Sequence, residues 1–262
     1  MYVFLVWLIS HNLLVLSQYE QAEEFLSIAS WCIIKNTNCP AHVRAELHQH
    51  FGLLYVAKNS MEKAVENLAT CVYYLALLHG TEHLITSYGY FNLGNVFATQ
   101  GKMDRAADYL RKVTDIWYRH LIAAISKETA SREPTPVHSN ANTQRTSKTS
   151  FSHLTNITSD ANTVYSDLPS ENTSLDALDE EKIHEASRMF ETVTNIQLDR
   201  YGENHIETGK VFLVYGLYQW WVGEIIKARE CLEKAASIYQ HVLGENHSAT
   251  REIWEIIDTM YV

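Results

Sequence analysis

The stretches "FGLLYVAKNSMEKAVENLATC" (51–71) and "LGNVFATQGKMDRAADYLRKV" (93–113) are two copies of one pattern, 42 residues apart. In each copy a large apolar residue precedes a glycine, an alanine follows 12 residues after that glycine, and a leucine comes four residues later. Apolar residues at helical spacing on both sides of a polar turn are typical of amphipathic helices. Each stretch therefore predicts an antiparallel helix hairpin.

The same pattern occurs twice more, as "ISHNLLVLSQYEQAEEFLSIA" (9–29) and "YGLYQWWVGEIIKARECLEKA" (215–235). A half copy at 183–198 carries only the second helix. Small residues recur at the positions that face the other helix, so the two backbones are predicted to approach closely there. These repeat-packing residues are Ser10, Ala22, Gly52, Ala64, Gly94, Ala106, Ala186, Gly216 and Ala228.

One hairpin cannot bury its apolar face alone, so repeated hairpins stack on one another. The predicted fold is all-α, a superhelical solenoid with a repeat of 42 residues. Residues 116–126 either extend the third hairpin or supply the helix that pairs with 183–198. We expect hairpins over 1–126, a disordered linker over 127–175 that is rich in Ser, Thr and Asn, and further repeat helices over 176–262.

The tetrapeptide Gly-Glu-Asn-His occurs at 202–205 and 244–247, and "GTEH" at 80–83 is related to it. In all three places it lies between two expected helices, with a threonine three residues after the histidine. We interpret it as a recurring turn, in which glycine ends one helix in a left-handed conformation and polar side chains cap the next. A shared metal or catalytic site would require distant turns of a solenoid to converge.

Composition and motifs exclude several function classes. The net charge is −10, from 21 basic and 31 acidic residues, which disfavours nucleic-acid binding and anionic membranes. No nucleotide-binding loop or hydrolase motif occurs, so we expect no catalytic residues, no metal site and no cofactor. His48 and His50 would point about 200° apart on a helix, so their side chains cannot bind one metal ion together. The four cysteines form no C-x-x-C pair.

The N-terminal stretch "MYVFLVWLISHNLLVL" is apolar but lacks a basic start and a cleavage site, which disfavours a signal peptide. It is also too short to span a bilayer. Asn156, Asn172 and Asn246 lie in N-x-S/T sequons, so a secreted glycoprotein stays an alternative. Unchanged gel mobility after endoglycosidase treatment would exclude it.

The functional candidate is a groove lined by the first helix of each hairpin. Counted from the small residue, the groove positions lie six and three before it and one and four after it. A mixture of apolar, aromatic and single polar residues is typical of a protein-recognition surface. The predicted groove residues are Trp7, His11, Glu46, Gln49, Leu53, Val56, Tyr88, Phe91, Asn95, Lys210, Leu213, Leu217 and Trp220. Some of them, Trp220 above all, are alternatively core residues.

The Gly, Tyr, Ala and Leu positions in phase resemble the tetratricopeptide repeat (TPR) family, and the longer unit resembles the repeats of kinesin light chains. Residues 21–121 further resemble the repeat region of ciliary TPR proteins that carry an N-terminal MYND zinc finger. This resemblance implies a scaffold in the axoneme of a cilium or sperm flagellum, working with another TPR protein and an inner-arm dynein heavy chain. No such finger is present in 1–262, which implies either a truncated sequence or a form without it. A kinesin-light-chain-like adaptor for cargo peptides is the alternative.

Overall fold

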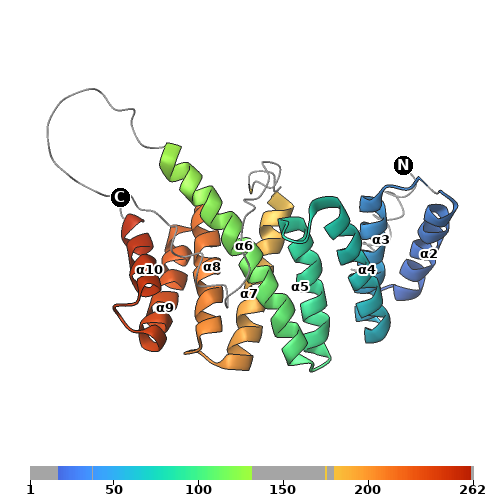
Figure 1. The fold of residues 1–262 in the computed structure, drawn as a ribbon. Coiled ribbons are helices and arrows are strands. Elements are labelled where there is room, and N and C mark those ends of the chain that lie inside the picture. The colour runs from blue at the N-terminus through green and yellow to red at the C-terminus, as the bar shows by residue number, and fades with distance from the viewer. Residues whose placement is uncertain (1–16, 37, 132–174, 176–179, 261–262) are drawn as a thin grey trace. The chain divides into compact units, whose positions relative to one another are not determined.

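The computed structural model describes residues 17–36, 38–131, 175 and 180–260, and the side chains of 128–131 and 180–181 lie outside the description. Figure 1 shows that the chain is helical over these ranges. The helices are α2 (Tyr19–Lys35), α3 (Ala41–Ala57), α4 (Met61–His79), α5 (Leu84–Thr99), α6 (Met103–Ser131), α7 (Glu180–Tyr201), α8 (Ile206–Val222), α9 (Ile225–Leu243) and α10 (Ser248–Thr259). The prediction of an all-α fold is confirmed.

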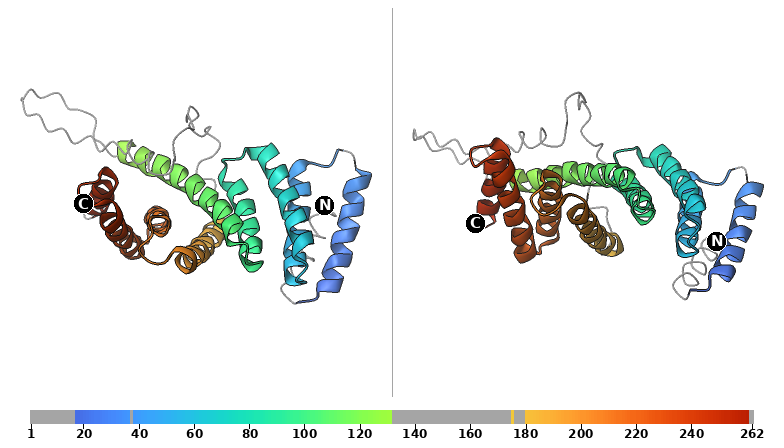
Figure 2. Two further views of the ribbon diagram at one scale, coloured as in Figure 1. Left: turned by 60° about the horizontal axis from the view of Figure 1, so that its bottom comes forward. Right: turned by 90° about the horizontal axis from the view of Figure 1, so that it is seen from below.

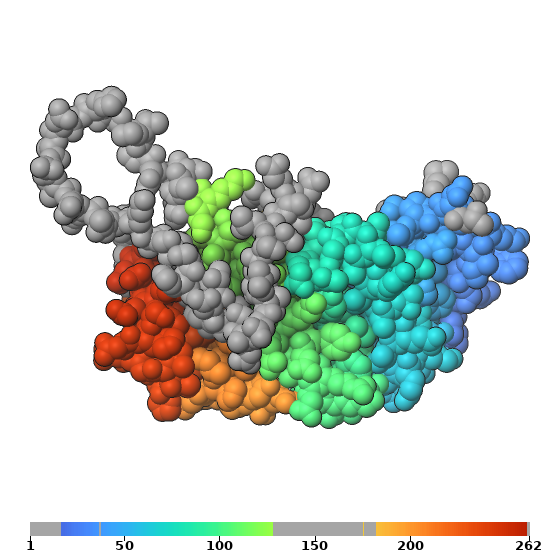
Figure 3. Space-filling model, in the orientation of Figure 1, coloured from blue at the N-terminus to red at the C-terminus, as the bar shows by residue number. Residues whose placement is uncertain are grey.

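The chain divides into two compact units, residues 1–116 and 117–262. In the first unit α3 packs on α2, α4 on α3, and α5 on α4. In the second unit α8 packs on α7, α9 on α8, and α10 on α9. Successive helices of each unit run up and down in Figure 1 and lie side by side in both views of Figure 2, which confirms the predicted stacking of antiparallel hairpins. The space-filling view shows side chains closing the spaces between these ribbons (Figure 3).

The glycines of the repeat lie where two helices meet. A Cβ built on Gly52 would lie 2.5 Å from Cδ2 of Leu68, and one on Gly94 would lie 2.8 Å from Cδ2 of Leu110. The repeat pattern predicts that the repeat alanine faces this glycine, whereas the nearest atoms belong to the leucine four residues later. At Gly216 the alanine also takes part, with the carbonyl oxygen of Ala228 at 3.1 Å. The repeat alanines themselves are buried.

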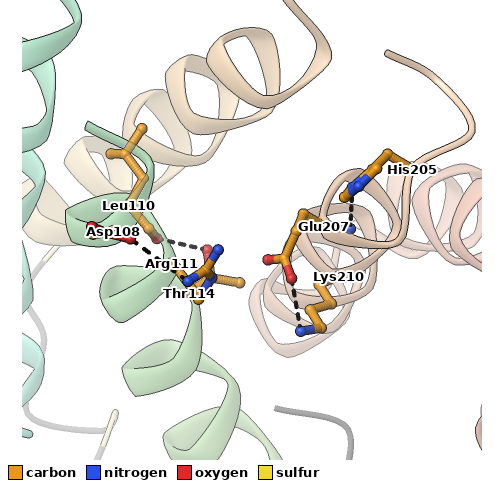
Figure 4. Close-up of polar contacts among 7 residues, drawn as sticks. All are labelled: Asp108, Leu110, Arg111, Thr114, His205, Glu207 and Lys210. Atoms are coloured by element: carbon orange, nitrogen blue, oxygen red, sulfur yellow. Dashed lines mark hydrogen bonds and ion pairs between the residues drawn. The ribbon is translucent and has the colours of Figure 1, made fainter. Parts of the chain in front are cut away.

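The three related turns share one set of hydrogen bonds. The backbone N–H two residues after the histidine donates to Nδ1 of His83, His205 and His247, so each histidine caps the following helix. The hydroxyl groups of Thr86, Thr208 and Thr250 donate to the carbonyl oxygens of Gly80, Gly202 and Gly244 at 2.8–3.0 Å. Figure 4 shows the cap at His205. The prediction of a capping turn is confirmed.

The conformation of the turn glycine differs from the prediction. Gly80 has φ 96° and ψ 160°, and Gly244 has φ 93° and ψ 160°. These values lie outside the left-handed helical region and in a region that essentially only glycine adopts. The left-handed glycine cap occurs instead at Gly223, between α8 and α9. The tetrapeptide therefore needs glycine because the chain must turn in this extended, positive-φ conformation.

We expect the histidine cap to contribute measurably to stability. Replacing His205 with alanine leaves the N–H of Glu207 without its acceptor, and loss of an N-cap costs about 1 kcal/mol. His205→Asp supplies another acceptor at the same position and should retain most of that free energy. Urea unfolding of the two variants tests this expectation. Equal loss in both variants would show that the ring packs against Tyr201, with which it stacks at 4.4 Å, rather than caps.

The long helix α6 resolves the open assignment of residues 116–126. They continue the second helix of the third hairpin without a break, as far as Ser131. The same segment also serves the half copy, because the indole of Trp117 packs edge-on against Phe190 of α7, with ring centroids 5.3 Å apart. Residues 116–126 therefore both extend the third hairpin and contact the helix of the half copy, as the two alternatives predicted.

The described helices and units differ from the predicted domain boundaries at three points. Helix α6 extends to Ser131, so residues 127–131 are not part of a disordered linker. Leu175, assigned to the end of that linker, is buried. The two compact units meet within α6, between Ile116 and Trp117, rather than at the linker. Residues 132–174 and 176–179 lie outside the described residues, where the linker stays a prediction.

Candidate protein-binding surface

The predicted groove residues of α3 lie at its surface. The helix begins directly after Pro40, whose φ of −58° suits a helix start. Glu46 is exposed, and Gln49, Leu53 and Val56 are half-buried. Val56 also packs against the core formed by α4 and α5. Helix α3 therefore presents both apolar and polar atoms to solvent at the predicted positions.

Helix α5 offers fewer of its predicted residues. Phe91 and Asn95 are half-buried and keep accessible surface. Tyr88 is only 4% exposed, so its assignment to the groove was wrong. The physical reason is that α5 is apolar on most sides and packs against α4 and, through Gly94 and Tyr90, against α6, so residues around most of its circumference are buried.

The predicted residues of α8 divide in the same way. Lys210 and Trp220 are half-buried. Leu213 and Leu217 are 2% and 0% exposed, so they belong to the core and their assignment to the groove was wrong. Like α5, α8 is mostly apolar and is covered by α7 and α9. Trp7, His11 and the repeat residue Ser10 lie outside the described residues.

Lys210 lies next to an acidic neighbour. Its ammonium is 3.0 Å from a carboxylate oxygen of Glu207, one helical turn earlier (Figure 4). Figure 4 also shows two contacts within α6, the ion pair of Asp108 with Arg111 and the hydrogen bond from the hydroxyl of Thr114 to the carbonyl of Leu110. Since Glu207 neutralises Lys210, this lysine presents little net charge to a partner.

A polar cluster joins α2 to α3. Lys58 donates to Glu23 at 2.6 Å, and the hydroxyl of Tyr55 donates to the other oxygen of Glu23 at 3.3 Å. The hydrogen bond from Lys58 lowers the pKa of Glu23, and the same bond raises the pKa of Lys58. Burial, followed by the nearby Glu23 charge, raises the pKa of Tyr55. The cluster therefore ties the first two described helices together through charge.

We expect Glu23→Gln to lower the free energy of unfolding by about 0.5–1 kcal/mol at pH 7, the range for partly exposed ion pairs. Because the folded-state pKa of Glu23 is depressed, its contribution is present above the unfolded-state value near 4.5 and is lost as the pH falls through the lower folded-state value. Urea unfolding at pH 7 and at about pH 3 measures both differences. A difference between the variant and the wild type that is equal at both pH values would contradict this account.

The cysteines should differ sharply in thiol reactivity. Burial raises the pKa of Cys71 to about 12, while Cys32 is exposed. Since the thiolate is the reactive form, Cys32 should react with maleimide at pH 7.5 at least about 100-fold faster than Cys71. Timed labelling read by peptide mass spectrometry gives both rates. If Cys71 of the folded chain is labelled as fast as Cys32, and as fast as both are in urea, then Cys71 is accessible and this prediction is wrong.

Accessible aromatic residues also lie on the second helices, outside the predicted groove. Trp31 of α2 and Tyr73 of α4 are each 59% exposed. A comparison of second-helix positions between repeats would have found them, because the later copies carry polar residues there. Among the described residues, no group of three or more His, Cys, Asp or Glu side chains is placed to hold a metal ion. No helix in the described ranges has the length and apolar character needed to cross a bilayer.

Comparison with known families identifies the repeat. Residues 87–116 and residues 217–249 each match a profile described as tetratricopeptide repeat. The first match covers most of α5 and the start of α6, and the second covers the end of α8, all of α9 and the turn that follows. The chain therefore contains TPR repeats in both units, as the sequence pattern predicted.

Two solved structures align with most of this chain. One is a structure of TPR-like repeats, nearly identical to one another, assigned to a kinesin light chain of Podosopora anserina. Its sequence is 17% identical to this chain, the alignment covers 92% of this chain and 97% of that one, and the TM-score is 0.40. BtubC (BKLC) from P. vanneervenii is 13% identical, with 93% and 82% covered and a TM-score of 0.40. Neither likeness says anything about partners.

Proposed function

We propose that this chain is a non-catalytic scaffold that binds a partner protein through the accessible residues of its first helices. The observation that carries the proposal is the surface of α3 and α5, where Leu53 and Phe91 expose apolar atoms beside the amide side chains of Gln49 and Asn95. Both helices pack against α4, which holds these residues on a rigid support. Apolar anchors beside a few polar groups are typical of protein-binding sites.

The proposed setting is the axoneme of a cilium or sperm flagellum. The support for it is the resemblance of residues 21–121 to the repeat region of zinc finger MYND domain-containing protein 12. By that resemblance, the partners are another TPR protein and an axonemal dynein heavy chain, and the role is the attachment or assembly of inner dynein arms. The acidic charge of −10 suits a partner surface that carries basic residues.

A cargo adaptor similar to kinesin light chains is the second candidate. The observation that favours it is the 42-residue spacing of the turns, His205 to His247, with equivalent hydrogen bonds in each. On this hypothesis the first helices bind short peptides rather than a folded partner. Fluorescence titration with acidic-aromatic peptides distinguishes the two, since only the adaptor should bind them in isolation.

Crosslinking mass spectrometry on isolated axonemes tests the scaffold directly. The tagged full chain is expressed in ciliated cells, and we expect crosslinks from α3 and α5 to one TPR protein and to dynein. The variant Leu53→Asp/Phe91→Asp should lose at least about 90% of these crosslinks, because charged residues replace the apolar anchors. The control Trp254→Asp, on α10, should retain them. Absence of the chain from axonemes would refute the axonemal setting, and retention of crosslinks in the double variant would refute the site.

A further inference from the structure

The second helices of the repeats differ at one outward position. This position lies nine residues after the repeat alanine, and the five described second helices allow a direct comparison. Its residues are Trp31, Tyr73, Asp115, Asn195 and Ser237. The first two copies thus carry large aromatic side chains where the later three carry short polar ones. Trp31 and Tyr73 are both more than half exposed, so neither side chain is needed to fill the core.

Trp31 and Tyr73 are exposed because they lie on the same outward side of their helices. Helix α4 is flanked by α3 on one side and α5 on the other, and Tyr73 and Leu77 are nevertheless 59% and 62% exposed. The equivalent residue Trp31 of α2 has the same exposed fraction as Tyr73. The helices on both sides of α4 therefore leave this face of it open.

Aliphatic residues extend each aromatic into a stripe. Ile28 and Ile34 lie one turn before and one turn after Trp31, and Leu77 lies one turn after Tyr73. All are exposed, and Ile34 is the most exposed of them at 68%. We define Ile28, Trp31, Ile34, Tyr73 and Leu77 as the outer apolar stripe. On each helix these residues expose apolar surface over successive turns, and exposed apolar surface of this kind marks interaction sites in soluble proteins.

Acidic residues mark one end of the stripe. Glu20 and Glu24 come 11 and 7 residues before Trp31, and Glu62 and Glu66 come 11 and 7 residues before Tyr73. At 100° per residue these spacings place each carboxylate within about 20° of the aromatic side chain, two to three turns away. All four are exposed. Two cations lie near these residues. The ammonium of Lys63 lies over the ring of Tyr55, and that of Lys35, one turn after Trp31, lies 4.8 Å from the centroid of the Trp31 ring, at the other end of the stripe from the carboxylates.

We propose that the outer apolar stripe binds an amphipathic helix of a partner protein. The apolar side of the partner helix lies on Trp31 and Tyr73, and the Lys- or Arg-rich end of that helix lies over the four carboxylates. A second copy of this chain is a poor occupant, since it carries the same acidic residues and a charge of −10. The stripe belongs to the second helices, so it is separate from the first-helix surface and stands independently of the function proposed for that surface.

Two labelled peptides test the chemistry of the occupant. Both are amphipathic helices of about 18 residues, about 27 Å long, with leucines along one side. One carries about three lysines in its last two turns, and the other carries glutamates there. We expect the full chain to bind the lysine peptide at least about tenfold more tightly by fluorescence anisotropy at low salt. Equal affinity for the two peptides would overturn the proposal.

Variants of the chain locate the site. Trp31→Ser/Tyr73→Ser introduces the residue that the chain itself has at position 237, and should weaken binding of the lysine peptide at least about tenfold. Glu24→Lys/Glu66→Lys should reverse the preference between the peptides. Trp254→Ser removes an exposed tryptophan outside the stripe and should change nothing.

The variants also give the outcomes that refute the site. An equal effect of Trp254→Ser, or none of the double serine variant, would overturn it. Circular dichroism of each variant should match that of the wild type, which checks that the exposed substitutions leave the fold intact. Light scattering tests whether a second copy of this chain occupies the stripe instead. If the measured mass rises with concentration in the wild type but not in the double serine variant, the stripe binds a second copy, and the proposal of a partner helix is refuted.

Discussion

Replacing Trp117 with alanine should lower the free energy of unfolding of the second unit by about 3–5 kcal/mol, the range for a fully buried tryptophan. The indole is completely buried and packs edge-on against Phe190 and Tyr218, with ring centroids at 5.3 and 5.7 Å. The substitution leaves a cavity in the contact that joins α6 to α7 and α8, and it removes two aromatic pairs worth about 0.5–1.5 kcal/mol each.

Urea unfolding followed by far-ultraviolet circular dichroism measures this loss. Because stability is commonly about 5–15 kcal/mol in total, we expect the second unit of the variant to unfold at much lower urea, before the first. Trp254→Ala is the matched control, since Trp254 of α10 is 39% exposed and should cost less than about 1 kcal/mol. Equal losses in the two variants would contradict the central place of Trp117.

Gly216→Leu should destabilise the chain by about 2 kcal/mol or more. A Cβ at this position already lies 2.7 Å from Cγ of Leu232 and 3.1 Å from the carbonyl oxygen of Ala228, and the latter atom belongs to the backbone and cannot turn away. Leucine is favoured over glycine within helices by about 0.8 kcal/mol. Overpacking costs about 1–3 kcal/mol for a few added methylene groups and more for a whole side chain, so the steric cost prevails.

The same unfolding experiment includes two controls. Ser237→Leu adds the same side chain to an exposed position of α9 and should change stability by no more than about 0.5 kcal/mol. Gly216→Ala combined with Leu232→Ala should lower the free energy of unfolding by less than the sum of the two single variants. The reason is that the added Cβ at position 216 and the side chain of Leu232 compete for the same space. Strict additivity would show that Gly216 and Leu232 do not limit each other.

The repeat pattern predicted more of the fold than of the binding surface. Gly52, Gly94 and Gly216 could be placed between helices from spacing alone, since only a close helix approach explains a small residue in phase with alanine. Tyr88 and Leu217 could not be placed, because a sequence does not say how far neighbouring helices cover an apolar helix. Positions on α5 and α8 that point outward in an isolated hairpin are buried when hairpins stack.

The sequence by itself determined that this chain forms helix hairpins, where they turn and how they repeat, because helical periodicity and capping residues act over a few positions. Only the tertiary structure decided that one helix, α6, completes the third hairpin and, through Trp117, also packs on α7. It alone distinguished the buried Leu213 from the exposed Trp31. Burial depends on contacts between residues far apart in the chain, which no local pattern records.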